Sequence, residues 1–412
     1  MEKLALYGGP KTKITPFGSG KRYGQEELDQ LREALEQNTL FYAHGKKTAR
    51  FLNKFKKMYG SPCAVAASSG TAAIHTALAA LDVGPGDEVI TSAVTDMGSV
   101  IGILFQNAVP VFADIDPHTY NMTAESIEER ITPQTKVIEV VHLAGNPADM
   151  NAVLEVSQKH GIPVVEDCAQ SYLSLYRGKL AGTFGEFGCF SLNDFKHISA
   201  GDAGMLITND EHLAWKAQMF TDKGYDRTKQ AHNPPFLAAN YRMNELEAAV
   251  AIAQLDRLPW IVSRRREYGN RLTEGISGLP GITPHKITPG GESSFWFYML
   301  RVDEKKLGAA RDLFADAVGA EGIPCTKGYI ARPLYLSELF QKKTIYPNFN
   351  WPEDFPQYAH SVTYPQGLCP AAENVLKTAV TFRLNEFFTE QDIEDMIRAI
   401  RKVVTGLFPK NR

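Results

Sequence analysis

The sequence has no excess of basic residues and no long apolar run. Its 412 residues include 44 Lys and Arg against 47 Asp and Glu, which gives a net charge of −3. This balance offers no positive field that would attract nucleic acid or an anionic membrane surface. No segment is long and apolar enough to cross a bilayer, and the first residues lack the apolar core of a signal peptide. We therefore expect a cytoplasmic protein that binds neither nucleic acid nor membrane.

Cysteine is also scarce. The five cysteines are scattered, odd in number and contain no CxxC pair; they are Cys63, Cys168, Cys189, Cys325 and Cys369. Neither a disulfide framework nor a zinc site follows from such spacing, so we expect a reduced protein without a bound metal.

Strand and helix patterns alternate from residue 62 onward. Short buried strands are predicted at 64–67, 88–92, 109–114, 136–143 and 162–165, and helices are predicted from 69 onward, at 97–105 and at 150–160. Repeated βα units predict an α/β fold with a mostly parallel sheet that is covered by helices on both faces. Ligands are expected at the carboxyl ends of its strands.

The segments on either side of this pattern differ from it. Before it lie two predicted helices, 24–38 and 48–59, joined by the aromatic loop 39–45, which either packs against a neighbouring domain or lines a substrate pocket. A helix at 244–258 and the basic residues 264–266 form a junction. After it come a strand run at 294–302, a helix at 309–318, a loop-rich stretch at 326–364 and an amphipathic helix at 389–404. We predict an arm with two helices (1–60), a large domain (61–258) and a smaller α+β domain (259–412).

Two strand ends carry candidate ligand groups. Ser69, Gly70 and Thr71 lie where a strand turns into a helix, and backbone N–H groups at such a turn can cradle a phosphate; a simple helix cap is the alternative. Glu166 and Asp167 end an apolar strand. A buried Asp there needs a cationic partner, such as the protonated pyridine nitrogen of pyridoxal phosphate, unless it only caps the next turn.

Two further motifs complete the set of candidates. A strand is predicted to start at Gly188 and end near Leu192, followed by a turn that presents Lys196, a Ser/Gly-rich bend and a return strand at 205–208. A lysine held in such a turn is either a Schiff-base residue or a solvated surface charge. Asn240 and Arg242 precede a helix of small apolar residues. They could bind phosphate or carboxylate, or serve as a cap and a surface ion pair.

A phosphate cradle, a strand-end Asp and a turn lysine follow each other in the order used by pyridoxal-phosphate enzymes of the aspartate-aminotransferase fold. The sequence resembles the DegT/StrS family of sugar aminotransferases from about Gly8 to the C-terminal helix, most strongly between residues 60 and 255. The resemblance rests on the segments 69–75, 84–90, 110–116, 141–150, 165–170, 190–196 and 240–246.

The resemblance implies a fold type I transferase with a large mixed, mostly parallel sheet and a smaller α+β domain. Lys196 matches the lysine that bonds the cofactor, Asp167 the partner of the pyridine nitrogen, and Gln170 the residue beside the ring. Ser69, Gly70, Thr71 and Ser191 match the phosphate site. Asn240 matches an asparagine that reaches the cofactor of the neighbouring subunit, which implies a homodimer with shared active sites.

The same resemblance implies ping-pong transfer of an amino group from L-glutamate or L-glutamine to a keto sugar or keto-cyclitol, with pyridoxamine phosphate between the two halves. The freed Lys196 amine would act as the general base. The segment Leu4–Thr12 is similar to members that act on keto-inositols. The candidate substrate residues are Tyr42, His44, Arg242, Tyr329, Arg332 and Tyr335.

The sequence also departs from the family pattern. Asp96, also a candidate cofactor-binding residue, stands where the family usually has an aromatic ring over the cofactor, so either another group covers the ring or Asp96 contacts substrate. Two further changes are milder: Ala203 stands where the family usually has the first of two glycines, and Cys168 stands where it usually has an alanine. Two alternatives stay open: a sugar dehydratase, in which histidine replaces the lysine and His197 would be the counterpart, and a cofactor-binding regulatory protein. The spacing from Phe190 and Ser191 favours Lys196.

Overall fold

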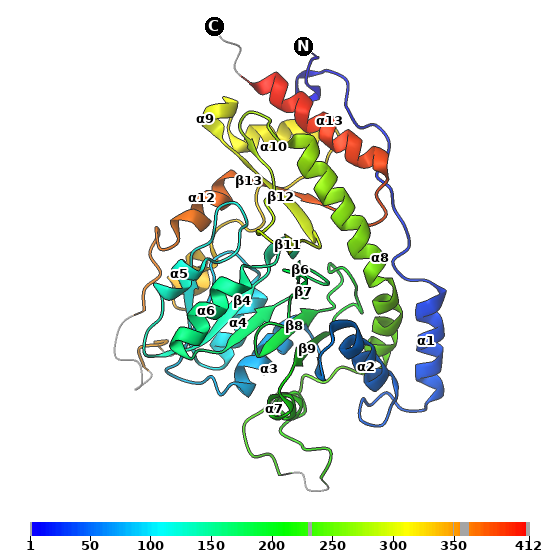
Figure 1. The fold of residues 1–412 in the computed structure, drawn as a ribbon, viewed down its shortest axis with the longest axis vertical. Coiled ribbons are helices and arrows are strands. Elements are labelled where there is room, and N and C mark those ends of the chain that lie inside the picture. The colour runs from blue at the N-terminus through cyan, green and yellow to red at the C-terminus, as the bar shows by residue number, and fades with distance from the viewer. Residues whose placement is uncertain (1, 230–232, 349, 355–361, 409–412) are drawn as a thin grey trace.

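A seven-stranded mixed sheet forms the centre of the larger part of the molecule (Figure 1). The computed structural model describes residues 2–229, 233–348, 350–354 and 362–408. The strands are β1 (Cys63–Ala67), β2 (Glu88–Ser92), β3 (Val109–Ala113), β4 (Thr135–Val141), β5 (Val164–Asp167), β8 (Phe187–Ser191) and β9 (Gly204–Thr208), in the order β1-β9-β8-β5-β4-β2-β3. Only β9 runs against its neighbours, so the other six carboxyl ends meet at one edge. This confirms the predicted α/β class.

Both faces of this sheet are covered by apolar cores, which explains why its strands are continuous apolar runs in the sequence. Along β9, Met205 and Ile207 belong to a core shared with α2 (Lys47–Tyr59) and α8 (Glu245–Ile276), whereas Leu206 belongs to a core shared with α3 (Gly70–Ala80). Side chains of successive strand residues point to opposite faces, so a strand covered on both sides must be apolar throughout. The other helices of this part are α1 (Gln25–Glu36), α4 (Met97–Phe105), α5 (Ala124–Glu128), α6 (Met150–His160) and α7 (Glu211–Thr221).

Helix α8 links the two parts of the molecule (Figure 1). The sequence predicts that it ends at Leu258; this prediction is wrong, because the helix continues through Pro259 to Ile276. Its first half packs Leu255 and Leu258 into the core of the large sheet, and its second half packs Leu272 and Ile276 into a separate core. Burial at both ends outweighs the hydrogen bond that the proline removes. The predicted domain boundary after residue 258 falls inside this helix and stays a prediction.

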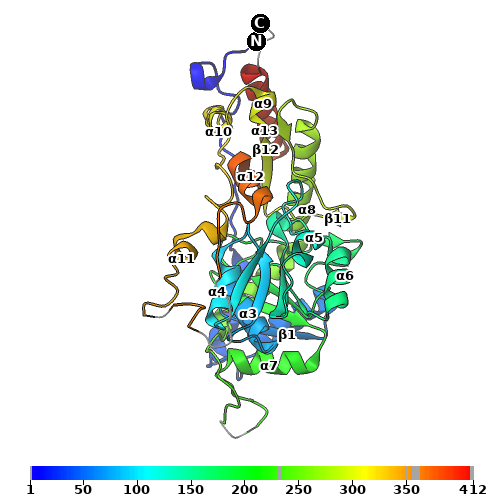
Figure 2. The same cartoon turned by 90° about the vertical axis from the view of Figure 1, so that its left-hand side faces the viewer.

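The second core lies around a smaller antiparallel sheet of β10 (Ile282–Thr283), β12 (Phe297–Val302) and β13 (Ala379–Arg383). Helices α10 (Arg311–Ala320) and α13 (Glu390–Leu407) pack against it (Figures 1 and 2), and Leu4 of the N-terminal arm belongs to the same core. The N-terminal arm is fixed there by Lys13, whose Nζ lies 2.5 Å from Asp392 and 3.3 Å from Asp395.

The remaining elements are short. They are η1 (Ala5–Tyr7), η2 (Leu143–Gly145), η3 (Leu334–Leu336), α9 (Glu304–Leu307), α11 (Glu338–Gln341), α12 (Pro370–Thr378), and a third sheet of β6 (Leu175–Tyr176), β7 (Lys179–Leu180) and β11 (Gly291–Glu292). Residues 349 and 355–361 of the predicted loop-rich stretch lie outside the described residues. Within the described part of the chain, no helix has the length and apolarity needed to cross a bilayer.

Candidate active site

The structure brings most of the predicted cofactor residues to one edge of the large sheet. Ser69, Gly70 and Thr71 follow β1, Asp96 follows β2, Asp167 ends β5, and Ser191 and Lys196 come at and after the end of β8. Because these strands run in the same direction, their carboxyl ends form a common edge. Parallel topology therefore assembles in space a set of residues that spans 128 positions in the chain (Ser69 to Lys196).

The cradle is built by close backbone packing. Ser69 is the N-cap of α3, and its Oγ accepts a hydrogen bond from Ala72 N–H at 3.0 Å, so the residue does cap the helix. A Cβ on Gly70 would lie 2.6 Å from the Cβ of Ser191, and a Cβ on Gly204 would lie 2.1 Å from the carbonyl oxygen of Ser69. Only glycine fits at these two positions. The N-terminus of α3 thus faces the end of β8, with geometry suited to an anionic group such as a phosphate.

Asp167 is a buried carboxylate, 5% exposed, held in one orientation. Its Oδ2 accepts from Ser99 Oγ at 2.7 Å, and its Oδ1 accepts from Ala169 N–H at 2.9 Å. Burial raises the pKa of Asp167, while these two hydrogen bonds and the charge of Lys196 oppose the rise. A buried carboxylate of this kind is stabilised by a nearby cation, and the protonated pyridine nitrogen of pyridoxal phosphate fits that requirement.

Lys196 lies in a turn that is held from several sides. Arg22 donates hydrogen bonds to the carbonyl oxygens of Asp194 and Lys196, and Trp296 Nε1 donates to the carbonyl of Phe195 at 2.7 Å. The Nζ of Lys196 lies 4.1 Å from the centroid of the Trp296 ring. Burial lowers the pKa of Lys196, against the raising effect of Asp167 and Asp96. A lysine with a lowered pKa has more of the unprotonated amine that acts as nucleophile or base.

Gln170 and Tyr329 form one wall beside this turn. Gln170 Oε1 accepts from Ala144 N–H at 2.8 Å, and its Nε2 donates to Tyr329 Oη at 2.9 Å. The Tyr329 ring stacks on Phe297, with centroids 5.0 Å apart, and meets the Trp296 ring edge-on at 6.1 Å. Tyr329 is therefore the candidate substrate residue that the structure connects directly to a candidate cofactor residue.

Other predicted residues lie elsewhere. Tyr42 and Arg242 both bind Asp222, with Oη–Oδ2 and Nη1–Oδ1 distances of 2.5 and 2.7 Å, and the backbone of Asn240 pairs with Asp222. His44 is exposed and meets the Phe41 ring edge-on. Among the described residues, no hydrogen bond or ion pair joins this Asp222 cluster to Lys196, Asp167 or Gln170.

Two candidates near residue 330 have different environments. Arg332 is exposed. Tyr335 is fully buried in the core, where its hydroxyl donates to Glu373 Oε1 at 2.7 Å and its ring packs near Phe112. An aromatic residue in a loop-rich stretch can equally be a core residue, and here the Tyr335 hydroxyl bonds inside the fold. The role of Tyr335 in a substrate pocket stays a prediction.

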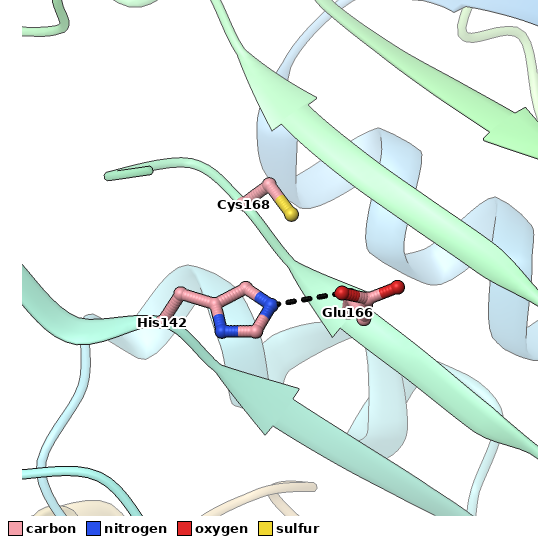
Figure 3. Close-up of side chains that lie close together, drawn as sticks. All are labelled: His142, Glu166 and Cys168. Atoms are coloured by element: carbon pink, nitrogen blue, oxygen red, sulfur yellow. Dashed lines mark hydrogen bonds and ion pairs between the residues drawn. The ribbon is translucent and has the colours of Figure 1, made fainter. Parts of the chain in front are cut away.

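Glu166 belongs to a structural cluster rather than to the ligand edge (Figure 3). His142 Nδ1 accepts from Ala148 N–H at 3.0 Å, so the neutral ring carries its proton on Nε2 and donates it to Glu166 Oε2 at 3.0 Å. Glu166 also accepts from the backbone N–H groups of Gly182, Phe184 and Gly185. Cys168 lies beside the pair, and burial raises the pKa of its thiol. Both ring nitrogens of His142 and both carboxylate oxygens of Glu166 already have hydrogen-bond partners, so neither residue offers a free ligand atom to a metal.

The sequence interpretation missed three residues that organise the site: Ser99, Trp296 and Arg22. Ser99 follows Asp96 by three residues, the spacing of one helical turn, and this spacing was the available signal. Nothing in the local sequence marks Arg22 or Trp296, because both reach the Lys196 turn from distant parts of the chain.

Comparison with known proteins gives consistent results. The sequence profile of the DegT/DnrJ/EryC1/StrS aminotransferase family matches residues 21–356. The spore coat polysaccharide biosynthesis protein SpsC of Bacillus subtilis is 33% identical, covering 93% of this chain and 95% of that protein. A putative L-glutamine:3-amino-2,3-dideoxy-scyllo-inosose aminotransferase of Streptoalloteichus tenebrarius is 31% identical over 97% of both chains. GDP-perosamine synthase of Caulobacter vibrioides is 32% identical over 93% of this chain and 96% of that protein.

Solved structures agree with these matches. An aminotransferase from Psychrobacter cryohalolentis superposes with a TM-score of 0.85 at 27% identity, covering 95% of this chain and 100% of that chain. The putative sugar aminotransferase Spr1654 from Streptococcus pneumoniae, solved in its PLP form, has a TM-score of 0.81 at 25% identity, covering 96% and 100%. The geometry of the sheet edge and these likenesses lead to one conclusion: the chain belongs to the DegT/DnrJ/EryC1/StrS family of pyridoxal-phosphate-dependent aminotransferases.

Proposed function

We propose that this enzyme takes an amino group from L-glutamine or L-glutamate and delivers it to the carbonyl of a polyhydroxylated ketone, either a keto sugar or a keto-cyclitol. The observation that carries the proposal is that Lys196 and the buried Asp167 lie at the same edge of the large sheet as the phosphate cradle at the N-terminus of α3. The names of two relatives support the two acceptor types: one is a putative L-glutamine:3-amino-2,3-dideoxy-scyllo-inosose aminotransferase and the other a GDP-perosamine synthase.

Each residue has a distinct role in this proposal. Pyridoxal phosphate supplies an electron sink when it is bound. The cradle of Ser69, Gly70, Thr71 and Ser191 holds its phosphate, and Asp167, oriented by Ser99, keeps its ring nitrogen protonated. Lys196 holds the resting cofactor, and its amine then takes the proton from the α-carbon of the donor. In the second half-reaction Lys196 returns a proton to the carbon that receives the amino group, and Gln170 orients the ring.

His197 has a different environment from Lys196, which favours transamination over sugar dehydration. Its ring is fully buried and its Nε2 donates to the carbonyl of Ser294 at 3.0 Å. Burial also holds the pKa of His197 well below its usual range. A neutral histidine that is committed to a backbone carbonyl is a structural group, so the lysine remains the candidate base. The family assignment likewise favours an enzyme over a regulatory protein.

We further propose a homodimer in which each active site takes Asn240 from the partner. Asn240 is exposed, and among the described residues no side-chain hydrogen bond joins it to the Lys196 edge of its own chain. Apolar side chains lie exposed next to both groups: Phe195, beside Lys196, is 66% exposed, and Leu237, close to Asn240, is 96% exposed. A symmetric interface that covers both would bring the two groups together.

The proposed compartment is the cytoplasm. All five cysteines are free thiols, and Cys168, Cys189 and Cys369 are buried. Burial raises the pKa of Cys168 and Cys189, which keeps both thiols protonated and unreactive. Free cysteines in this number suit a reducing environment.

Replacement of Lys196 tests the chemistry. The wild-type protein should carry a visible absorbance band of bound cofactor, and borohydride should attach the cofactor to the peptide that contains Lys196. The Lys196→Ala variant should lose the attachment and at least about 10⁴-fold in activity, as expected when a nucleophile and base is removed. Lys305→Ala, which changes an exposed lysine of α9, is the matched control. Attachment at another residue, or wild-type protein without cofactor, would refute the proposal.

A panel of acceptors tests the substrate class. The pyridoxamine form, made with L-glutamine, is mixed with scyllo-inosose or with a nucleotide-linked keto sugar, and the return of the resting absorbance is followed. At least one of these acceptors should restore it. If pyruvate or oxaloacetate restores it and no polyhydroxylated ketone does, the proposed acceptor class is wrong.

A further inference from the structure

We propose that Asp96 is a specificity-determining residue of this enzyme: its carboxylate accepts hydrogen bonds from hydroxyl or ammonium groups of the acceptor and disfavours acceptors that place a phosphate or carboxylate beside it. The inference rests on the proposed function and narrows its substrate class to an uncharged or amino-bearing polyol ketone.

The first turn of α4 places Asp96 at the site. Asp96 is the N-cap of this helix, and its Oδ1 accepts from Gly98 N–H at 2.8 Å. Ser99, in the same turn, donates to Asp167 Oδ2 at 2.7 Å. A Cβ on Gly98 would lie 2.7 Å from Thr71 Oγ1. The turn that carries Asp96 is therefore packed between the phosphate cradle and the carboxylate that faces the cofactor ring.

The second oxygen of Asp96 is available to a ligand. The residue is exposed, and among the described residues neither a hydrogen bond nor an ion pair involves its Oδ2. Its charge nevertheless acts on the site. Burial has the larger effect, lowering the pKa of Lys196 and raising that of Tyr329, and the charge of Asp96 adds an upward contribution to both pKa values. A free carboxylate oxygen thus lies within electrostatic reach of the reacting amine and of the Tyr329 wall.

The chemistry of the Asp96 Oδ2 oxygen determines which keto substrates the site favours. An ionised carboxylate only accepts hydrogen bonds, so it pairs with hydroxyl or ammonium groups and repels anions. Tyr329 Oη accepts from Gln170 and keeps its own proton to donate. The site then offers a hydrogen-bond acceptor, the Asp96 carboxylate, and a hydrogen-bond donor, the Tyr329 hydroxyl. This pair suits the hydroxyl groups that flank the carbonyl of a polyol ketone. Loss of a hydrogen bond to a charged group costs about tenfold or more in affinity.

The test uses the pyridoxamine form of the full-length enzyme and the variants Asp96→Asn and Asp96→Ser. Both side chains can cap α4, and neither carries the charge. We expect kcat/KM for scyllo-inosose to fall about tenfold or more, and to fall clearly more than the rate of the half-reaction with L-glutamine, because an effect that acted only through the charge near Lys196 would slow both half-reactions alike. The control is Asp210→Asn, which changes the N-cap of α7. Asp210 follows the end of β9 that lies away from the cradle, so this variant should alter neither half-reaction.

Each outcome decides the inference. Equal losses in the donor and acceptor half-reactions, or an unchanged preference between scyllo-inosose and a nucleotide-linked keto sugar, would show that Asp96 only caps α4. A wild-type preference for the nucleotide-linked sugar would also overturn the inference, although it would leave the proposed function standing. Wild-type protein that forms no pyridoxamine from L-glutamine or L-glutamate would instead refute the proposed function.

Discussion

At the scale of single residues, the reactivity of Lys196 results from opposing influences. Burial lowers its pKa, and the carboxylates of Asp167 and Asp96 raise it. The face of Trp296, 4.1 Å from Nζ, adds a third influence because the electron-rich face of an indole attracts a cation. The amine is therefore poised between the protonated form, which the carboxylates and the indole stabilise, and the neutral form, which reacts.

Trp296→Leu should move this balance toward the neutral amine. Loss of the cation–π contact, worth about 0.5 to 2 kcal/mol, removes a stabilisation of the protonated amine and so lowers the pKa of Lys196 further. The rate at which the apoprotein recaptures pyridoxal phosphate follows the unprotonated amine, so its pH midpoint should shift downward. Trp296→Phe keeps a ring and should shift the midpoint less.

A control variant separates this effect from a general loss of tryptophan packing. Trp215, on α7, contacts His212 and Asp226. Trp215→Leu should leave the midpoint unchanged. An unchanged midpoint in folded Trp296→Leu would mean that the indole face does not stabilise the lysine cation.

At the scale of elements, α8 positions the Lys196 turn through an intermediate residue. Gln254 and Arg257 of α8 donate to the carbonyl of Arg22 at 2.8 and 2.6 Å. Arg22 in turn binds the carbonyl oxygens of Asp194 and Lys196 with its guanidinium group. The long helix thus fixes the backbone of a turn that it does not itself contain.

Arg22→Ala should loosen this turn without removing any reacting group. We expect the half-reaction with L-glutamine to slow about ten- to hundredfold, because small misplacements of a reacting group cost rates of this order. Stopped-flow absorbance measures it. Lys21→Ala, at the exposed neighbouring position, should react at the wild-type rate, and an equal rate for Arg22→Ala would show that the turn holds its shape without the arginine.

Local sequence was enough to predict the elements of the large sheet but not those that depend on distant packing. β2, α4 and α6 have the predicted bounds, because apolar periodicity and caps such as Asp96 and Asp149 are local signals. Helix α8 was cut short at Pro259 because its second half is stabilised by a core that only the folded chain assembles. Strand β13 was missed for the same reason: it pairs with β12, about 80 positions earlier.

At the scale of the whole molecule, the order of motifs along the chain was enough to predict which candidate residues meet at one edge of the sheet. The cradle, Asp167 and Lys196 each end or follow a strand, and parallel topology brings such positions together. The candidate substrate residues were less predictable. Tyr42 and Arg242 bind Asp222, whereas Tyr335 lies in the core and binds Glu373. These residues have the right chemistry for a pocket, but their positions depend on long-range contacts that no local pattern encodes.

The cluster of Asp222, Tyr42 and Arg242 can take part in the reaction only if a second copy of the chain carries it to the Lys196 edge. Heterodimers assembled from a Lys196→Ala subunit and an Asn240→Ala subunit, isolated with two different tags, test this. If sites are shared, both lesions fall in one site and the other is intact, so the heterodimer should have about half the wild-type activity. Each homodimer should be strongly impaired.

The matched control pairs Lys196→Ala with Asp167→Ala. Both residues belong to the same edge of the same chain, so each site of that heterodimer carries one lesion and no activity should return. Activity in the first heterodimer that stays at or below half that of the Asn240→Ala homodimer would mean that each chain completes its own site. Among the described residues, no hydrogen bond or ion pair joins the cluster to the edge within one chain, so complementation would also explain how the partly exposed Arg242 and Tyr42 take part in an active site.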